Sequence, residues 1–180
     1  GDEVILFAPT YDAYAPLVRR AGGVPVFVAL HPPLWTYGRE AIEAALSPRT
    51  RAIVFNDPLN PTGTCASDAE LAMLADLCVA HDLIAICDEV WEAVRFDGRP
   101  HASLIAQPGM AQRAVKIGSA GKIFGATGWK IGWMCAAPEM AAVLARAHQF
   151  ITFTTPPALQ YAVAEGLASD ALITERREGW

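Results

Sequence analysis

Short apolar runs alternate along this chain with longer segments in which apolar residues recur every three to four positions. Runs of the first kind are typical of strands buried on both faces of a sheet, and the longer segments are typical of helices that pack on it. The alternation predicts an α/β fold whose strands are mostly parallel. The predicted strands are Glu3–Ala8, Pro25–Leu30, Arg51–Phe55, Leu83–Cys87, Ala114–Ile117 and Ile131–Ala136. The predicted helices are Asp12–Ala21, Arg39–Leu46, Ser67–His81, Glu139–Phe150 and Pro157–Leu167.

One of these helices starts with a capping box. Ser67 and Glu70 stand three residues apart, so each side chain can accept a hydrogen bond from the backbone N–H of the other. The apolar positions that follow at the spacing of one helix face are Leu71, Leu74, Ala75 and Cys78. We therefore expect the helix to pack this face against the sheet.

The composition is that of a folded chain. Of the 180 residues, 53% are hydrophobic and 18% are charged, which excludes a disordered protein. The net charge is −5 and no basic stripe is present, so we expect neither a nucleic-acid partner nor binding to an anionic membrane. The longest uncharged stretch, residues 147–164, is interrupted by Pro156 and Pro157, so we predict no membrane span.

The cysteines and histidines show no metal-binding spacing. No CxxC pair and no HExxH motif occurs, so we predict no metal site. The cysteines lie in apolar runs, which favours small buried side chains in a reducing compartment, the cytoplasm. The four cysteines are Cys65, Cys78, Cys87 and Cys135, and the four histidines are His31, His81, His101 and His148.

Polar residues collect where three predicted strands end. Residues 56–63, Asn-Asp-Pro-Leu-Asn-Pro-Thr-Gly, follow one strand; Asp88-Glu89 follows the next; and residues 118–122, Gly-Ser-Ala-Gly-Lys, follow a third. Ligands of open α/β sheets bind beyond the carboxyl ends of the strands. We therefore expect an amide, a carboxylate, a hydroxyl and an ammonium to meet at one edge of the sheet.

Each of these segments also has a simpler interpretation. Asn-Pro-Thr-Gly on its own is more often a turn, and an Asp at a strand end is more often a cap. The segment around Lys122 does not match a P-loop, because Lys116 stands where the first Gly would be. Ser119 and Lys122 have the spacing of the nucleophile pair of penicillin-binding enzymes, but Ser-Asp-Asn and Lys-Thr-Gly motifs are missing. The three segments together, in this order, favour a functional site.

In its motifs the chain resembles the class I and II (fold type I) pyridoxal phosphate-dependent aminotransferases. The resemblance is strongest to the branch with kynurenine aminotransferases (glutamine transaminase K) and methionine aminotransferases. It implies a three-layer α/β/α large domain with a mixed, mostly parallel sheet. The matching stretches are Gly1-Asp2-Glu3-Val4, Ala21-Gly22-Gly23, Asn60-Pro61-Thr62-Gly63, Asp88-Glu89-Val90, Gly118-Ser119-Ala120-Gly121-Lys122 and residues 126–133, Ala-Thr-Gly-Trp-Lys-Ile-Gly-Trp.

The resemblance implies that Lys122 holds pyridoxal 5'-phosphate as an internal aldimine and then moves the substrate Cα proton as a base. Asp88 would face the pyridine nitrogen and Asn60 would bind the ring oxygen O3′. A carboxylate beside the ring nitrogen favours its protonated form, which strengthens the ring as an electron sink. A free lysine amine in a cationic, partly desolvated pocket is a usable base near neutral pH.

Three further residues take cofactor-binding roles from the same resemblance. Ser119 would contact the phosphate, as would Lys130, where many relatives carry Arg. Lysine offers phosphate a compact point charge in place of a bidentate fork. Tyr11 falls where the family places an aromatic ring stacked on the cofactor, a contact worth about 0.5–1.5 kcal/mol.

Trp91 departs from the family pattern. Relatives read Asp-Glu-Val-Tyr, with the Tyr hydroxyl donating to O3′ of the cofactor, and here the fourth residue is Trp91. If its indole N–H does not reach that oxygen, one donor is lost and the internal aldimine should hold its proton more tightly. The alternative is that Trp91 only fills the space and points elsewhere.

The resemblance also implies which parts of the family are missing. The Gly-rich phosphate loop lies upstream of Gly1, and the arginine that binds the substrate α-carboxylate lies in the C-terminal small domain, beyond Trp180. We expect residues 1–180 to be the central part of the large domain, inactive when isolated. No signal peptide is apparent, and cis peptide bonds are expected before Pro9 and Pro61.

The function implied is transfer of an amino group between an amino acid and a 2-oxo acid. The expected substrate is hydrophobic, aromatic or sulfur-containing, since Trp129 and Trp133 make the region apolar. The expected partners are these small molecules and a second subunit in a homodimer. Three alternatives stay open: a cysteine-conjugate β-lyase, an aminotransferase-like sensor domain of a transcription regulator, and an inert remnant.

Overall fold

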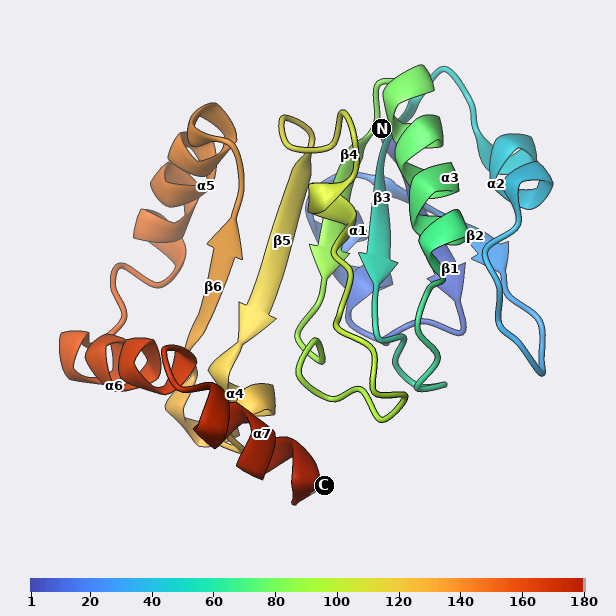
Figure 1. Ribbon diagram of the computed structural model, residues 1–180. Coiled ribbons are helices and arrows are strands. Elements are labelled where there is room, and N and C mark those ends of the chain that lie inside the picture. The colour runs from blue at the N-terminus through green and yellow to red at the C-terminus, as the bar shows by residue number, and fades with distance from the viewer. Residues whose placement is uncertain (180) are drawn as a thin grey trace.

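The described residues fold around a single six-stranded sheet. A computed structural model describes residues 1–179, and Figure 1 shows the arrangement of its elements. The strands lie in the order β2-β1-β3-β4-β5-β6, all parallel except β6, which runs antiparallel to β5. The strands are β1 (Glu3–Ala8), β2 (Val24–Ala29), β3 (Thr50–Asn56), β4 (Ile84–Asp88), β5 (Ala114–Ser119) and β6 (Gly132–Cys135).

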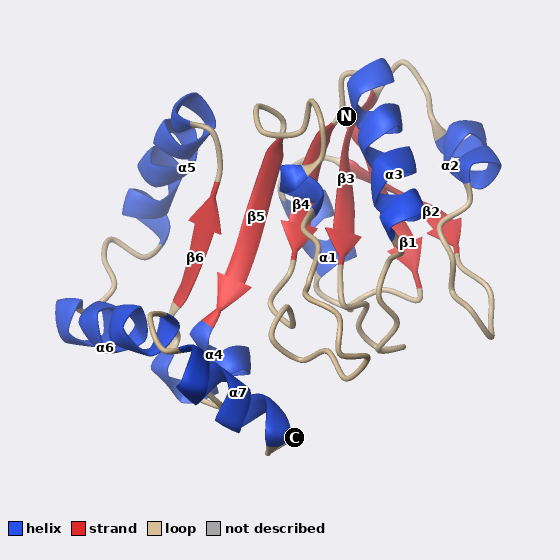
Figure 2. Ribbon diagram, viewed as in Figure 1, coloured by secondary structure: helices blue, strands red, loops and turns tan. Residues whose placement is uncertain are grey.

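Helices lie on both faces of this sheet, which confirms the predicted three-layer α/β/α class. α3 is drawn in front of the sheet and α1 behind it (Figures 1 and 2). The helices are α1 (Tyr14–Arg20), α2 (Arg39–Ala45), α3 (Asp68–Ala80), α4 (Ala120–Ile123), α5 (Pro138–Ile151), α6 (Pro157–Leu167) and α7 (Asp170–Glu178). Two short 3-10 helices, η1 (Leu104–Ala106) and η2 (Thr127–Trp129), follow β4 and α4.

The core lies between α3 and the central strands. Ile5 of β1, together with Ile53 and Phe55 of β3, is almost fully buried. The predicted apolar face of α3 is buried as well, and the capping box between Ser67 and Glu70 is present with both of its hydrogen bonds. The neighbouring strands from β2 to β5 run parallel because the crossovers between consecutive strands return the chain to the same end of the sheet.

The predicted strands and helices are all present, with ends that shift by one or two residues. The sequence pattern missed α4, which is only one turn long, and α7, which is largely charged and has no apolar stripe. The helix α7 nevertheless has a local start signal, because the Ser169 side chain accepts a hydrogen bond from the backbone N–H of Leu172.

Other expectations are confirmed in part. Cis peptide bonds precede Pro9 and Pro61 as expected, and two more precede Pro33 and Pro58. Cys78 and Cys87 are buried free thiols, but Cys65 is half-buried and Cys135 is exposed, because the edge strand β6 is covered on few sides. Within residues 1–179, no helix combines the length and the apolar character needed to cross a membrane.

Gly118 gives a test of how β5 and β6 pack. It lies directly opposite Trp133 in the antiparallel pair, and a Cβ atom at this position would overlap the indole ring. We expect Gly118→Ala to lower the free energy of unfolding by about 1–3 kcal/mol, as overpacking does in well-packed interiors. Denaturant titration of the full-length protein measures this change.

Gly128→Ala is the matched control, because a Cβ there would meet no atom within 4 Å. It should change the free energy of unfolding by less than about 0.5 kcal/mol. Equal effects of the two substitutions would contradict the assignment of the close contact to Trp133.

Candidate active site

The carboxyl ends of β3, β4 and β5 lie side by side at one edge of the sheet (Figure 1). The register pairs Asn56 with Asp88 and Asp88 with Ile117. The first residues beyond the strands continue the pairing, since the backbone N–H of Asp57 donates to the Asp88 carbonyl at 3.1 Å. The predicted meeting of the three polar segments is therefore observed.

Asp88 has a partner that the sequence did not reveal. The hydroxyl of Tyr14, the first residue of α1, donates to Asp88 Oδ2 at 2.6 Å. Burial, and then the neighbouring carboxylate, raises the pKa of Tyr14 far above its ordinary value, so the phenol keeps its proton and remains a donor. Tyr11 packs its ring edge-on against Tyr14, with centroids 5.5 Å apart, and stays 47% exposed. One side of the Asp88 carboxylate is thereby held by α1.

Asn56 connects Asp88 to the loop that carries Asn60. Its side-chain Nδ2 donates to the Asp88 carbonyl at 2.8 Å, and its Oδ1 accepts a hydrogen bond from the Asn60 backbone N–H at 2.8 Å. Asn56 itself is buried, and a hydrogen bond in such surroundings is stronger than one exposed to water. This role was missed from the sequence; its only signal is an amide at the last position of a buried strand.

Lys122 and Trp91 face each other. Lys122 lies on the single turn of α4 that follows β5, and its Nζ is 4.6 Å from the centroid of the Trp91 ring. A cation above an indole face is attracted by the electron density of the ring. The alternative that Trp91 points away from the other candidate residues is not observed, because its ring lies beside the Lys122 amine.

Ser119 and Lys130 flank the same turn. Ser119 precedes α4, and the backbone N–H of Ala120 donates to the Ile131 carbonyl at 3.1 Å, which brings the chain next to Lys130 back to the end of β5. Lys130 is exposed and has a left-handed backbone, with φ of 56°. The phosphate-binding candidates thus lie on neighbouring segments at the carboxyl end of β5.

Two cavities adjoin these residues. Asn60 and Trp91 line one of about 620 Å³, whose wall also includes Arg95. Tyr14 and Asp88 line another of about 470 Å³ on the face covered by α1. Neither is lined by Lys122, so the described cavities border the candidate residues without enclosing them together.

Comparison with known proteins identifies the family. The sequence model of the protein family described as aminotransferase class I and II matches residues 1–179. The chain belongs to this family. Its members depend on pyridoxal phosphate, so the resemblance seen in the motifs is confirmed at the family level.

The relatives include aminotransferases of several kinds. Kynurenine–oxoglutarate transaminase 3 of Mus musculus is 41% identical over 180 residues, a match that covers 94% of this chain and 40% of the relative. Methionine aminotransferase of Escherichia coli is 38% identical, over 94% of this chain and 44% of its own. The structure of N-succinyldiaminopimelate aminotransferase from Mycobacterium tuberculosis has a TM-score of 0.95 and 41% identity, with 99% of this chain and 47% of that chain covered. The chain therefore spans less than half the length of these relatives.

The residues at the sheet edge fit pyridoxal phosphate by their chemistry. An aldehyde needs an amine, which Lys122 offers, and a pyridine nitrogen needs an anionic partner, which Asp88 offers while Tyr14 holds it. The side-chain amide of Asn60 suits the phenolic oxygen. Nothing in this donor set opposes the cofactor.

Asp57, which follows Asn56, is fully buried, and this predicts a pH dependence of stability. Burial raises the pKa of its carboxyl to about 6, and the nearby Glu89 carboxylate also raises this pKa. The Ala66 N–H, His101 and Arg95 act in the opposite direction, since they favour the charged form. The folded protein therefore binds this proton more tightly than the unfolded chain, whose carboxyl has the ordinary value of 3.8. The contribution of Asp57 to stability is largest below pH 4 and falls as the pH rises to about 6.

We expect Asp57→Asn to remove this contribution. Between pH 4 and 7, wild type should lose on the order of 1–3 kcal/mol of unfolding free energy relative to the variant. Denaturant titrations at four pH values measure the difference. Asp76→Asn, at an exposed side chain on α3, should run parallel to wild type; a parallel profile for Asp57→Asn would overturn the assignment.

Proposed function

We propose that the protein is a pyridoxal phosphate-dependent aminotransferase and that this chain forms the central part of its large domain. The observation that supports this most directly is the convergence of Lys122, Asp88 and Asn60 at one edge of the sheet. Membership of the family and the transaminase activities named for the relatives support it further.

The cofactor supplies an electron sink for the charge left when the substrate Cα loses its proton. Lys122 would bind the cofactor aldehyde through Nζ and, once the substrate amine has displaced it, take and return the Cα proton. Its place on a single turn directly after β5 sets its backbone next to the strand ends. Asp88 would keep the pyridine nitrogen protonated, and Tyr14 would hold Oδ2 of that carboxylate in place.

The remaining site residues would bind and orient. Asn60 would donate to the phenolic oxygen, and its loop is held by Asn56. Ser119 and Lys130 would bind the phosphate, and Tyr11 would cover the ring. Trp91 presents its face to Lys122, so we propose that it forms a wall of the site and that its indole N–H does not replace the Tyr hydroxyl of relatives.

We propose a hydrophobic, aromatic or sulfur-containing amino acid and a 2-oxo acid as substrates. The relatives named for kynurenine and methionine support this class. A homodimer is proposed for the whole enzyme, since several large apolar side chains of α5, α6 and the segment between them are exposed. These are Phe150, Ile151, Phe153 and Tyr161. The four free cysteines agree with a cytoplasmic location.

The function is tested by labelling the cofactor lysine in the full-length protein. After addition of pyridoxal phosphate and reduction with borohydride, mass spectrometry should find the modification on Lys122 and not on Lys116 or Lys130. Before reduction, the same protein with bound pyridoxal phosphate should transfer the amino group of an amino acid only when a 2-oxo acid is present.

The other outcomes are distinct. Release of pyruvate and ammonia from cysteine conjugates without a 2-oxo acid would favour the β-lyase. A labelled Lys122 without any turnover would favour a sensor domain. An unlabelled Lys122 would overturn the proposal.

Tyr14→Phe tests the support of Asp88. The variant removes the 2.6 Å hydrogen bond to the carboxylate and keeps the ring. A hydrogen bond to a charged group contributes about 1.5–3 kcal/mol, so we expect kcat to fall roughly tenfold or more while Lys122 is still labelled. Asp76→Asn, at an exposed side chain on α3, is the control. An unchanged kcat in Tyr14→Phe would show that Asp88 needs no such support.

A further inference from the structure

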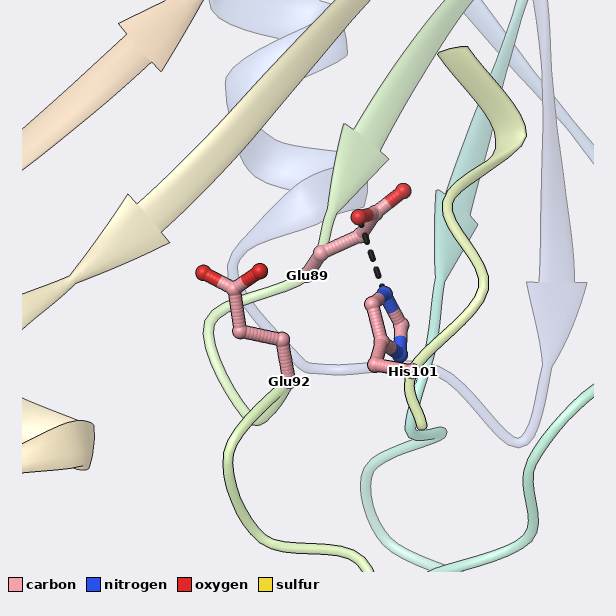
Figure 3. A group of neighbouring side chains, drawn as sticks. All are labelled: Glu89, Glu92 and His101. Carbon is pink, nitrogen blue, oxygen red and sulfur yellow. Dashed lines mark hydrogen bonds and ion pairs between the residues drawn. The ribbon is translucent and has the colours of Figure 1, made fainter. Parts of the chain in front are cut away.

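A second polar cluster lies on the opposite side of β4 from Tyr14. Glu89 directly follows Asp88, but its side chain is fully buried and points toward the segment that leads into η1 (Figure 3). Its Oε1 accepts hydrogen bonds from the Ser103 hydroxyl at 2.7 Å and the Leu104 backbone N–H at 3.3 Å. Its Oε2 lies 2.9 Å from His101 Nε2. Glu89 therefore anchors this segment to the end of β4.

His101 also reaches the end of the neighbouring strand. Its Nδ1 lies 3.6 Å from Asp57 Oδ2, and both atoms are buried. Among the residues that the structure describes, neither atom has a hydrogen-bond partner, and the contact between them is longer than a hydrogen bond. The ring thus lies between two carboxylates that extend the ends of β3 and β4.

A metal ion is the first alternative for this cluster. Glu89, Glu92 and His101 each offer a ligand atom, and these atoms lie within 4.8 Å of one another. However, the Lys116 ammonium from β5 forms ion pairs with both Glu92 and Glu89. The protein therefore supplies its own cation at this place, and a divalent ion would have to displace it against its charge. The cluster is better explained as an internal network.

The network holds the backbone that carries the candidate active site. Asp57 donates its N–H to the Asp88 carbonyl, and its Oδ1 accepts from the Ala66 N–H at 2.7 Å. This second bond closes the loop of residues 57–66, which contains Asn60. A shift of Asp57 or Glu89 would therefore move Asp88 and the Asn60 loop with it.

We propose that His101 is a positioning residue of the active site. By bridging Asp57 and Glu89, it joins the ends of β3 and β4 and keeps the Asp88 carboxylate and the Asn60 loop in a fixed relation. The proposal rests on the proposed function for its catalytic meaning. Its structural part, the local clamping of the two strand ends, can be measured without cofactor.

The first measurement is hydrogen exchange of the cofactor-free, full-length protein. In His101→Ala, backbone amides in peptides that cover residues 56–66 and 86–92 should exchange at least about tenfold faster. The reason is that local opening no longer costs the free energy of breaking the His101 contacts. Peptides of β2 and α2 should be unchanged. Leu74→Ala, a cavity control in the core beneath α3, should increase exchange in α3 instead. Unchanged exchange of the two strand ends, or the same pattern in the control, would overturn the proposal.

The second measurement is the affinity for pyridoxal phosphate, followed by its visible absorbance. We expect the Kd to rise about tenfold or more in His101→Ala and less than about twofold in Leu74→Ala. If His101→Ala does not fold, His101→Gln, whose amide can donate to one carboxylate, should show the same changes at a smaller size. Wild-type affinity in either folded variant would contradict a role in positioning the site. A wild-type protein that binds no pyridoxal phosphate would refute the proposed function. Hydrogen exchange alone would then test whether His101 holds the ends of β3 and β4 together.

Discussion

The pairing of β3 with β4 is the constraint on which the rest of the site depends. Because Asn56 lies directly beside Asp88, its amide can bind the Asp88 carbonyl and the Asn60 backbone at once. A slip of one residue would turn every side chain of the strand to the other face. The buried apolar positions of both strands make such a slip costly, so the core enforces the geometry of the polar edge.

The end of β4 places two adjacent carboxylates in different surroundings. Asp88 faces α1 and accepts from Tyr14, whereas Glu89 faces the opposite side and is enclosed by His101, Ser103 and Lys116. Both are compensated, since a buried unpaired carboxylate would be expensive. Because successive side chains point to opposite faces, Asp88 stays available to a ligand, whereas Glu89 is used in contacts within the protein.

Much of this arrangement could be predicted from local patterns. The alternation of apolar runs predicted all six strands, and the capping box predicted the start of α3, because both depend on residues close together in the sequence. Because ligands of open α/β sheets bind beyond the carboxyl ends of the strands, the sequence also predicted that the segments with Asn60, Asp88 and Lys122 would meet. Tyr14 and Asn56 were missed, since a tyrosine at a helix start and an amide at a strand end have no distinctive local signal. The helix α7 was missed because its residues are mostly polar.

The sequence by itself determined the fold class, the family and the set of chemically suitable residues. These follow from periodicity and motifs, which are properties of neighbouring positions along the chain. Only the tertiary structure decided that Tyr14 binds Asp88, that Trp91 turns its face to Lys122, and that His101 lies between Asp57 and Glu89. Such contacts join residues up to 74 positions apart, and their geometry depends on how the strands pair and on which face each helix covers.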